Sequence, residues 1–201
     1  MKKYLKLIPV ILFFSCEKSI NNYAIVIHGG AGTVIRENTS KELQKKYEDK
    51  LREALEVGHS ILESGGSSVD AVEKTIKILE DSELFNAGKG SVLTNEETVE
   101  MDASIMTGSN LNAGAVATLK TIKNPISAAR AVMEKSKHVF LSGKGAENFA
   151  VDNGLETVNN NYFITEKQLK QIRKIKENKY GTVGCVALDK SGNITAGTST
   201  G

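Results

Sequence analysis

The last part of the chain, TVGCVALDKSGNITAGTST, contains two strand-like runs joined by a turn. The first run, 182–188, is apolar or small at almost every position, which is typical of a strand buried on both faces. Asp189 and Gly192 supply the turn with residues that favour tight chain reversals. We therefore expect a β-hairpin whose first strand is buried on both faces, so the fold must contain a sheet that accommodates this hairpin.

Upstream of the hairpin, helical and strand patterns follow one another without regular alternation. Strand patterns cover residues 23–27, 98–106, 112–119 and 138–142. Apolar spacings of three and four, with Pro125 in a first turn, predict helices over 39–63, 68–80, 125–136 and about 145–153. This order predicts an α+β fold rather than a repeated βαβ fold. A chain of 201 residues, of which 40% are hydrophobic, is long enough for one domain with a real core.

A basic segment lies just before the hairpin. Residues 166–179, EKQLKQIRKIKENK, contain six basic and two acidic residues on a weak apolar stripe. No aromatic side chain is interleaved with the basic ones, as a nucleic-acid surface would favour, and the formal net charge of the whole chain is only +2. We expect a solvated helix or a flexible linker here, and no nucleic-acid partner.

The amino end reads MKKYLKLIPVILFFSCEKS, in which lysines precede a short apolar run, Leu7–Phe14. Such a run is too short to span a bilayer, which takes about 20 residues, and is typical of an export signal over residues 1–15. A buried first strand is the alternative, but Pro9 could not donate in its ladder. Ser-Cys at the end of the run also resembles a bacterial lipoprotein signal, with Cys16 acylated as the mature terminus. We expect an exported bacterial protein, periplasmic or membrane-anchored through Cys16.

Several glycine-rich loops and three histidines are candidates for binding sites. The loops HGGAGT, NAGKGS and SGKGAE match neither nucleotide-binding glycine pattern, so we interpret them as tight turns. His28, His59 and His138 lack the spacing of a zinc site. No G-x-S-x-G sequence, the nucleophile elbow of serine hydrolases, is present.

The dipeptide Gly181-Thr182 has two interpretations. It is either a plain entry into the strand or a self-cleavage site. A threonine hydroxyl is a weak nucleophile that needs a base, and cutting before Thr182 would free an α-amine with a pKa of about 7.7–8.0 that can serve as one. Glycine tolerates a strained conformation that exposes its carbonyl to the hydroxyl, which permits an N-to-O acyl shift followed by ester hydrolysis.

Five segments together resemble the plant-type asparaginases, also called isoaspartyl peptidases. They are HGGAG (28–32), LEDSELFNAGKGSVLT (79–94), EMDASIM (100–106), GAENFA (145–150) and GTVGCVALDKSGNITAGTSTG (181–201). The likeness runs in consistent order from Tyr23 to Gly201, and its last segment is highly specific. HGGAG favours this branch over the related glycosylasparaginases.

The resemblance implies an amino-terminal-nucleophile (Ntn) hydrolase with an αββα four-layer sandwich, cut between Gly181 and Thr182. Thr182 would then be the nucleophile and, through its amine, the base. Thr200 matches a second threonine that hydrogen-bonds near the nucleophile, and Asn86 matches an asparagine that borders it. The protein would hydrolyse L-asparagine and β-aspartyl dipeptides without a cofactor, as a homodimer of two-chain protomers.

The same resemblance implies a structural sodium ion wrapped by backbone carbonyls. Carbonyl oxygens suit a hard monovalent cation and leave no side-chain pattern in the sequence. The matching positions are Leu79, Glu80, Ser82, Phe85, Ala87 and Lys89.

The family's chain continues past TSTG with a Gly-Arg-x-Gly-Asp-Ser-Pro segment that holds the substrate and a Thr-Gly-x-Gly segment that builds the oxyanion hole. Neither is in this sequence. We therefore expect a truncated copy or fragment, with an α-subunit-like part over 16–181 and the beginning of the β subunit over 182–201. The 201 residues alone should not turn over substrate. The alternative is a non-catalytic exported lipoprotein or scaffold module that keeps part of the fold.

Overall fold

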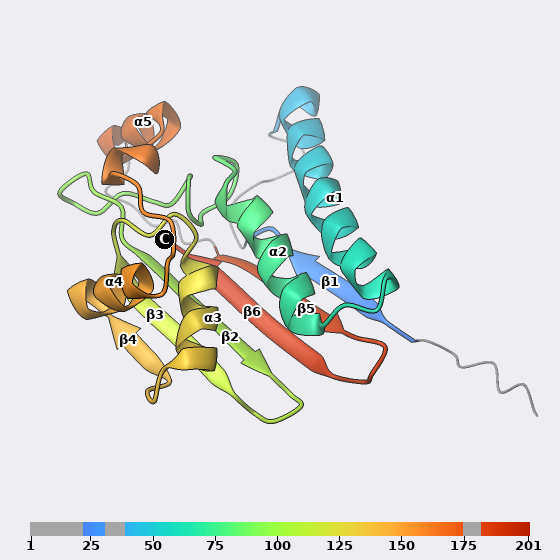
Figure 1. The fold of residues 1–201 in the computed structure, drawn as a ribbon. Coiled ribbons are helices and arrows are strands. Elements are labelled where there is room, and N and C mark those ends of the chain that lie inside the picture. The colour runs from blue at the N-terminus through green and yellow to red at the C-terminus, as the bar shows by residue number, and fades with distance from the viewer. Residues whose placement is uncertain (1–21, 31–38, 175–181) are drawn as a thin grey trace, which may run out of the picture.

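The strands form one six-stranded sheet in the order β1-β5-β6-β2-β3-β4 (Figure 1). The computed structural model describes residues 22–30, 39–174 and 182–201. Within them the strands are β1 (Ala24–His28), β2 (Met101–Thr107), β3 (Ala113–Leu119), β4 (Phe140–Ser142), β5 (Thr182–Leu188) and β6 (Ile194–Thr200). Only the β3–β4 pair is parallel among these neighbours. The mixed order agrees with the predicted α+β class.

The predicted hairpin is confirmed, and it occupies the middle of the sheet. β5 and β6 pair with each other from Thr182↔Thr200 to Leu188↔Ile194, while β1 flanks β5 and β2 flanks β6. In the turn, the Gly192 amide donates to the Asp189 carbonyl, and Gly192 has a φ of +81° that favours glycine. The sheet therefore depends on the last residues of the chain for its centre.

Helices α1 to α4 pack on one face of this sheet, and α5 lies apart from it (Figure 1). The helices are α1 (Lys41–Glu63), α2 (Ser68–Glu80), α3 (Pro125–Lys135), α4 (Gly143–Asp152) and α5 (Glu166–Lys174), with a short 3₁₀ turn, η2 (Asn160–Tyr162). α2 has the bounds that its apolar spacing predicted, and the Ser67 side chain caps it by accepting from the Asp70 amide. α5 confirms the helical interpretation of the basic segment up to Lys174. None of the helices in the described ranges is long and apolar enough to cross a bilayer.

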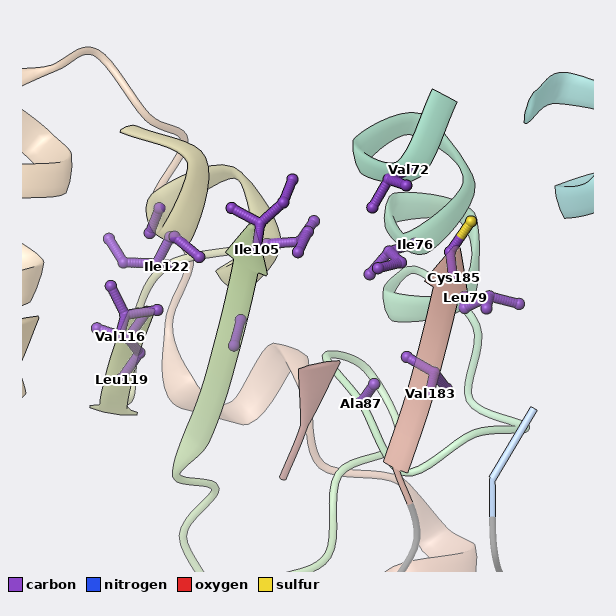
Figure 2. Packing of buried hydrophobic residues seen from close by; sticks show 14 of the residues in the cluster. Val72, Ile76, Leu79, Ala87, Ile105, Val116, Leu119, Ile122, Val183 and Cys185 are labelled. Atoms are coloured by element: carbon purple, nitrogen blue, oxygen red, sulfur yellow. The ribbon is translucent and has the colours of Figure 1, made fainter. Parts of the chain in front are cut away.

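The core lies between the helices and the covered face of the sheet. Val72, Ile76 and Leu79 follow one side of α2 and are fully buried. They pack toward Val183 and Cys185, the inward-facing residues of β5 (Figure 2). Burial raises the pKa of the Cys185 thiol to about 12, so this cysteine is a core residue rather than a reactive thiol.

The opposite face of the sheet carries exposed apolar side chains. Val26, Met106 and Val186 are 69%, 44% and 47% exposed. A shallow apolar hollow of about 620 Å³ lies over this face. The expectation that residues 182–188 are buried on both faces is therefore wrong for the described structure, because helices cover one face only. Of the four predicted layers, the described residues form two, one of helices and one of strands.

Candidate active site

Thr182 and Thr200 face each other at one end of the hairpin. They are register partners on β5 and β6, and the Thr182 hydroxyl donates to the Thr200 hydroxyl with an Oγ1–Oγ1 distance of 3.1 Å. Their neighbours Val183 and Ser199 point into the core, so alternation along the strands directs both threonines to the open face. Gly181, on the other side of the predicted cleavage bond, lies outside the described residues. The structure thus brings together the two threonines that the sequence singled out.

The glycine-rich segment after β1 lies against the backbone of Thr182. Gly30 has a φ of +125°, a conformation that side chains rarely adopt. A Cβ atom on Gly30 would lie 3.7 Å from the Thr182 carbonyl oxygen and 4.0 Å from its amide nitrogen. His28, two residues earlier, pairs with Gly184 and fixes the direction in which this segment leaves the sheet. Gly30, the second glycine of HGGAG, therefore forms one wall beside Thr182.

Asn86 holds the end of β6. Its Nδ2 donates to the Gly201 carbonyl at 3.3 Å, and its Oδ1 accepts from the Val92 amide at 2.7 Å. A Cβ atom on Gly201 would come within 2.0 Å of the Ser91 Cβ, so this contact requires glycine. Asn86 was expected to border the nucleophile, and in the structure it contacts the residue that follows Thr200.

Behind the threonines, on the covered face, Glu80 is fully buried at the end of α2. Its Oε1 accepts from the Ser199 hydroxyl at 2.7 Å and from the Ile126 amide, in the first turn of α3, at 2.9 Å. Burial raises the pKa of Glu80 to about 8, although these bonds oppose the rise. The sequence predicted only that the backbone carbonyl of Glu80 helps to hold sodium. It did not predict the buried side chain, because no residue spacing indicates that a glutamate at the end of a helix points inward.

The loop after α2 packs closely around two of the carbonyl oxygens that were expected to hold sodium. A Cβ on Gly88 would lie 2.3 Å from the Glu80 carbonyl oxygen, and one on Gly90 would lie 2.4 Å from the Phe85 carbonyl oxygen. The turn is therefore wound closely around these oxygens. The Glu80 carbonyl also accepts from the Lys89 amide at 2.6 Å, which leaves a second lone pair for a cation. The six sodium positions stay a prediction, and no cluster of three acidic, histidine or cysteine side chains in the described ranges could hold a metal.

Comparisons with known proteins agree on one family. A family model described as asparaginase matches residues 21–179 and 171–201. An isoaspartyl peptidase/L-asparaginase of Bos taurus is 45% identical over 190 residues, which are 90% of this chain and 60% of that protein. An isoaspartyl peptidase of Escherichia coli K12 is 42% identical, covering 88% of this chain and 60% of its own length. The human isoaspartyl peptidase/L-asparaginase is 44% identical with 90% and 60% coverage, so the chain spans about 60% of these relatives.

Proposed function

Because this chain belongs to the asparaginase family, we propose that it is the amino-terminal-nucleophile part of an amidohydrolase that acts on L-asparagine and β-aspartyl dipeptides. The observation that carries the proposal is the 3.1 Å hydrogen bond between the hydroxyls of Thr182 and Thr200. The described residues form one helical layer and one sheet, half of the family's αββα sandwich.

Maturation is a cut between Gly181 and Thr182. The Thr182 Oγ attacks the Gly181 carbonyl carbon, the peptide C–N bond breaks, and the Thr182 nitrogen takes up a proton as an ester forms. Water hydrolyses this ester and leaves a Gly181 carboxylate, a free Thr182 hydroxyl and a free Thr182 amine. Thr200 accepts the hydroxyl hydrogen of Thr182 in the structure, so it orients the attacking oxygen.

Turnover uses the same oxygen. The freed amine of Thr182 takes the Oγ proton while Oγ attacks the side-chain amide carbon of the substrate, and it then passes this proton to the amide nitrogen as the C–N bond breaks. Ammonia leaves from asparagine, and the following amino acid leaves from a β-aspartyl dipeptide. Water then cleaves the acyl ester and releases aspartate, so the reaction uses only groups of the protein and water.

Substrate binding requires more than these residues. The segments that hold the substrate's charged ends and the oxyanion follow TSTG in the family that the sequence resembles. We therefore assign turnover to a protein that also carries those segments. A homodimer of two-chain protomers remains part of this proposal, and size-exclusion chromatography with light scattering tests it.

Two further assignments belong to the proposal. Leu79, Glu80, Ser82, Phe85, Ala87 and Lys89 hold a structural sodium ion through their carbonyls, supported by the close winding around Glu80 and Phe85. Residues 1–15 form an export signal and Cys16 a lipidated terminus in the periplasm or membrane, supported by the lysine-apolar-cysteine pattern. Both parts of that leader lie outside the described residues. Palmitate labelling of wild type against Cys16→Ser tests the lipid.

Intact-mass measurement tests the proposal directly. The wild-type chain should yield two fragments whose masses locate the cut between Gly181 and Thr182. Thr182→Ala should remain whole because it lacks the attacking oxygen, and Thr182→Ser should still be cut. Thr107→Ala, at the far end of β2, is the matched control and should be cut at the wild-type rate. A folded wild-type chain that stays whole would favour the non-catalytic scaffold alternative.

A further inference from the structure

Glu80 connects three elements at a single oxygen. Its Oε1 joins the end of α2 to Ser199 of β6, at 2.7 Å, and to the Ile126 amide at the start of α3, at 2.9 Å. The carboxyl group is fully buried beside apolar residues of α2. Burying a carboxyl group costs more free energy than burying a leucine of similar size. The hydrogen bonds that Glu80 makes to Ser199 and Ile126 are therefore the favourable contribution that a leucine could not supply.

Ser199 lies directly between the two threonines that face the open side, Thr198 and Thr200. Its own side chain points to the covered side and is fully buried. In register it opposes Val183, the neighbour of Thr182. The hydrogen bond from Ser199 to Glu80 therefore links β6 to α2 one residue before Thr200. This bond fixes the position of the end of β6 relative to α2.

The backbone of Glu80 holds the other side of the same strand end. Its carbonyl accepts from Lys89 at 2.6 Å, which closes the loop that carries Asn86, and Asn86 in turn binds Gly201. Glu80 thus reaches the residues on both sides of Thr200, Ser199 through its side chain and Gly201 through the loop.

We infer that Glu80 is a positioning residue for self-cleavage, and that its side-chain oxygen, acting through Ser199, keeps the Thr200 hydroxyl within hydrogen-bonding distance of Thr182. The inference rests on the proposed function for the expected change in cleavage rate. The expected change in the position and amide exchange of the end of β6 does not depend on that function. The positioning role depends on the Glu80 Oε1 as a hydrogen-bond acceptor. A glutamine, which keeps that oxygen, therefore replaces the glutamate, whereas a leucine of similar size does not.

The test compares four variants of the 201-residue chain with wild type. Glu80→Leu removes the acceptor, Glu80→Gln keeps it, and Ser199→Ala removes the donor with a smaller change in the core. Glu73→Leu is the matched control, because Glu73 is another buried glutamate of α2 but binds Ser127 and Arg130 instead of β6. The measurements are the cleavage rate by intact mass, thermal unfolding, and hydrogen exchange of the amides of residues 198–201.

Glu80→Leu and Ser199→Ala should slow cleavage about tenfold or more, since small misplacements of reacting groups have effects of this size. Both should also speed amide exchange at the end of β6. Glu80→Gln should cut within about threefold of wild type. Glu73→Leu should lose thermal stability yet keep the wild-type rate and exchange at 198–201, which separates positioning from general stability.

The inference is overturned if Glu80→Leu and Ser199→Ala keep wild-type exchange at residues 198–201, or if Glu80→Gln behaves like Glu80→Leu. It is also overturned if Glu73→Leu slows cleavage as much as Glu80→Leu does. A wild-type chain that is never cut contradicts the proposed function alone, and the exchange measurements then still decide the inference. If Glu80→Leu does not fold, Ser199→Ala decides it.

Discussion

The two faces of the sheet differ in what they do, although they are built from alternate residues of the same strands. On β5 and β6, the residues toward the helices include Val183, Cys185 and Ser199, which are nearly or fully buried. The residues toward the open face include Thr182 and Thr200, whose hydroxyls meet. Packing on one face therefore holds the backbone that presents the candidate nucleophile on the other. Because successive side chains of a strand point to opposite faces, the residues that stabilise the fold and the candidate catalytic residues lie on different faces of the same strands.

The largest expected difference comes from truncating one isoleucine on each side of the sheet, Ile76 of α2 on the helical side and Ile194 of β6 on the open side. Ile76→Ala, in the fully buried core, should lower the free energy of unfolding by about 2–5 kcal/mol because it leaves a cavity. Ile194→Ala, at a 54% exposed position on the open face, should lower it by about 1 kcal/mol or less. Urea unfolding of the 201-residue chain measures both. Equal losses would show that the open face is covered in solution.

A pair of glycines compares the space available on each face. A Cβ on Gly197 would lie 2.6 Å from Val72 Cγ1 and 3.1 Å from Ile76 Cδ1, so Gly197→Ala should cost about 1–3 kcal/mol through overpacking. On Gly184 the nearest heavy atom is the Gly197 carbonyl oxygen at 3.4 Å, and Gly184→Ala should change stability by about 0.5 kcal/mol at most. Chemical denaturation again measures the change. A larger loss at position 184 would contradict the assignment of the two faces.

The smallest expected effect concerns Glu73, a nearly buried carboxyl group between α2 and α3 on the helical side of the sheet, and it depends on pH. Burial opposes ionisation of Glu73, but bonds from Ser127 and Arg130 prevail and hold the pKa of this carboxyl below its usual value. Its stabilising contribution is therefore present above pH about 4.3, the unfolded value, and is lost as the pH falls through the folded pKa. Glu73→Gln should cost about 1–2 kcal/mol at pH 7.

The difference in stability between wild type and Glu73→Gln should narrow on acidification below pH about 4.3. Unfolding measured at a series of pH values gives this difference. Glu134→Gln is the matched control, since Glu134 binds the same Arg130 at an exposed position and should contribute about 0.5 kcal/mol or less. A difference that widens in acid would refute the sign.

Local pattern was enough to predict much of this fold. The three- and four-residue spacing in 68–80 predicted α2 with its observed bounds, and the apolar runs around DKSGN predicted the hairpin. Once that hairpin is in register, Thr182 must oppose Thr200. The sequence was therefore enough to predict that Thr182 and Thr200 lie together and that Thr182 is the candidate nucleophile.

Features that depend on distant partners were not predictable. Residues 182–188 are apolar or small on both faces, so their pattern could not reveal that helices cover only one. The inward turn of Glu80 depends on Ser199 and Ile126, which are far away in the chain. The hydrogen bond from Asn86 to the Gly201 carbonyl joins residues 115 positions apart, and no local spacing predicts it.

The position of β1 at the edge of the sheet has a consequence for synthesis of the chain. Within the described sheet β1 pairs only with β5, which follows about 150 residues later, or about 8–30 s at ordinary translation rates. Until then β1 has no strand beside it, while β2, β3 and β4 can already associate. The nascent chain thus exposes an unpaired strand edge over this interval, so we expect a lower growth temperature or added chaperone to raise its soluble yield.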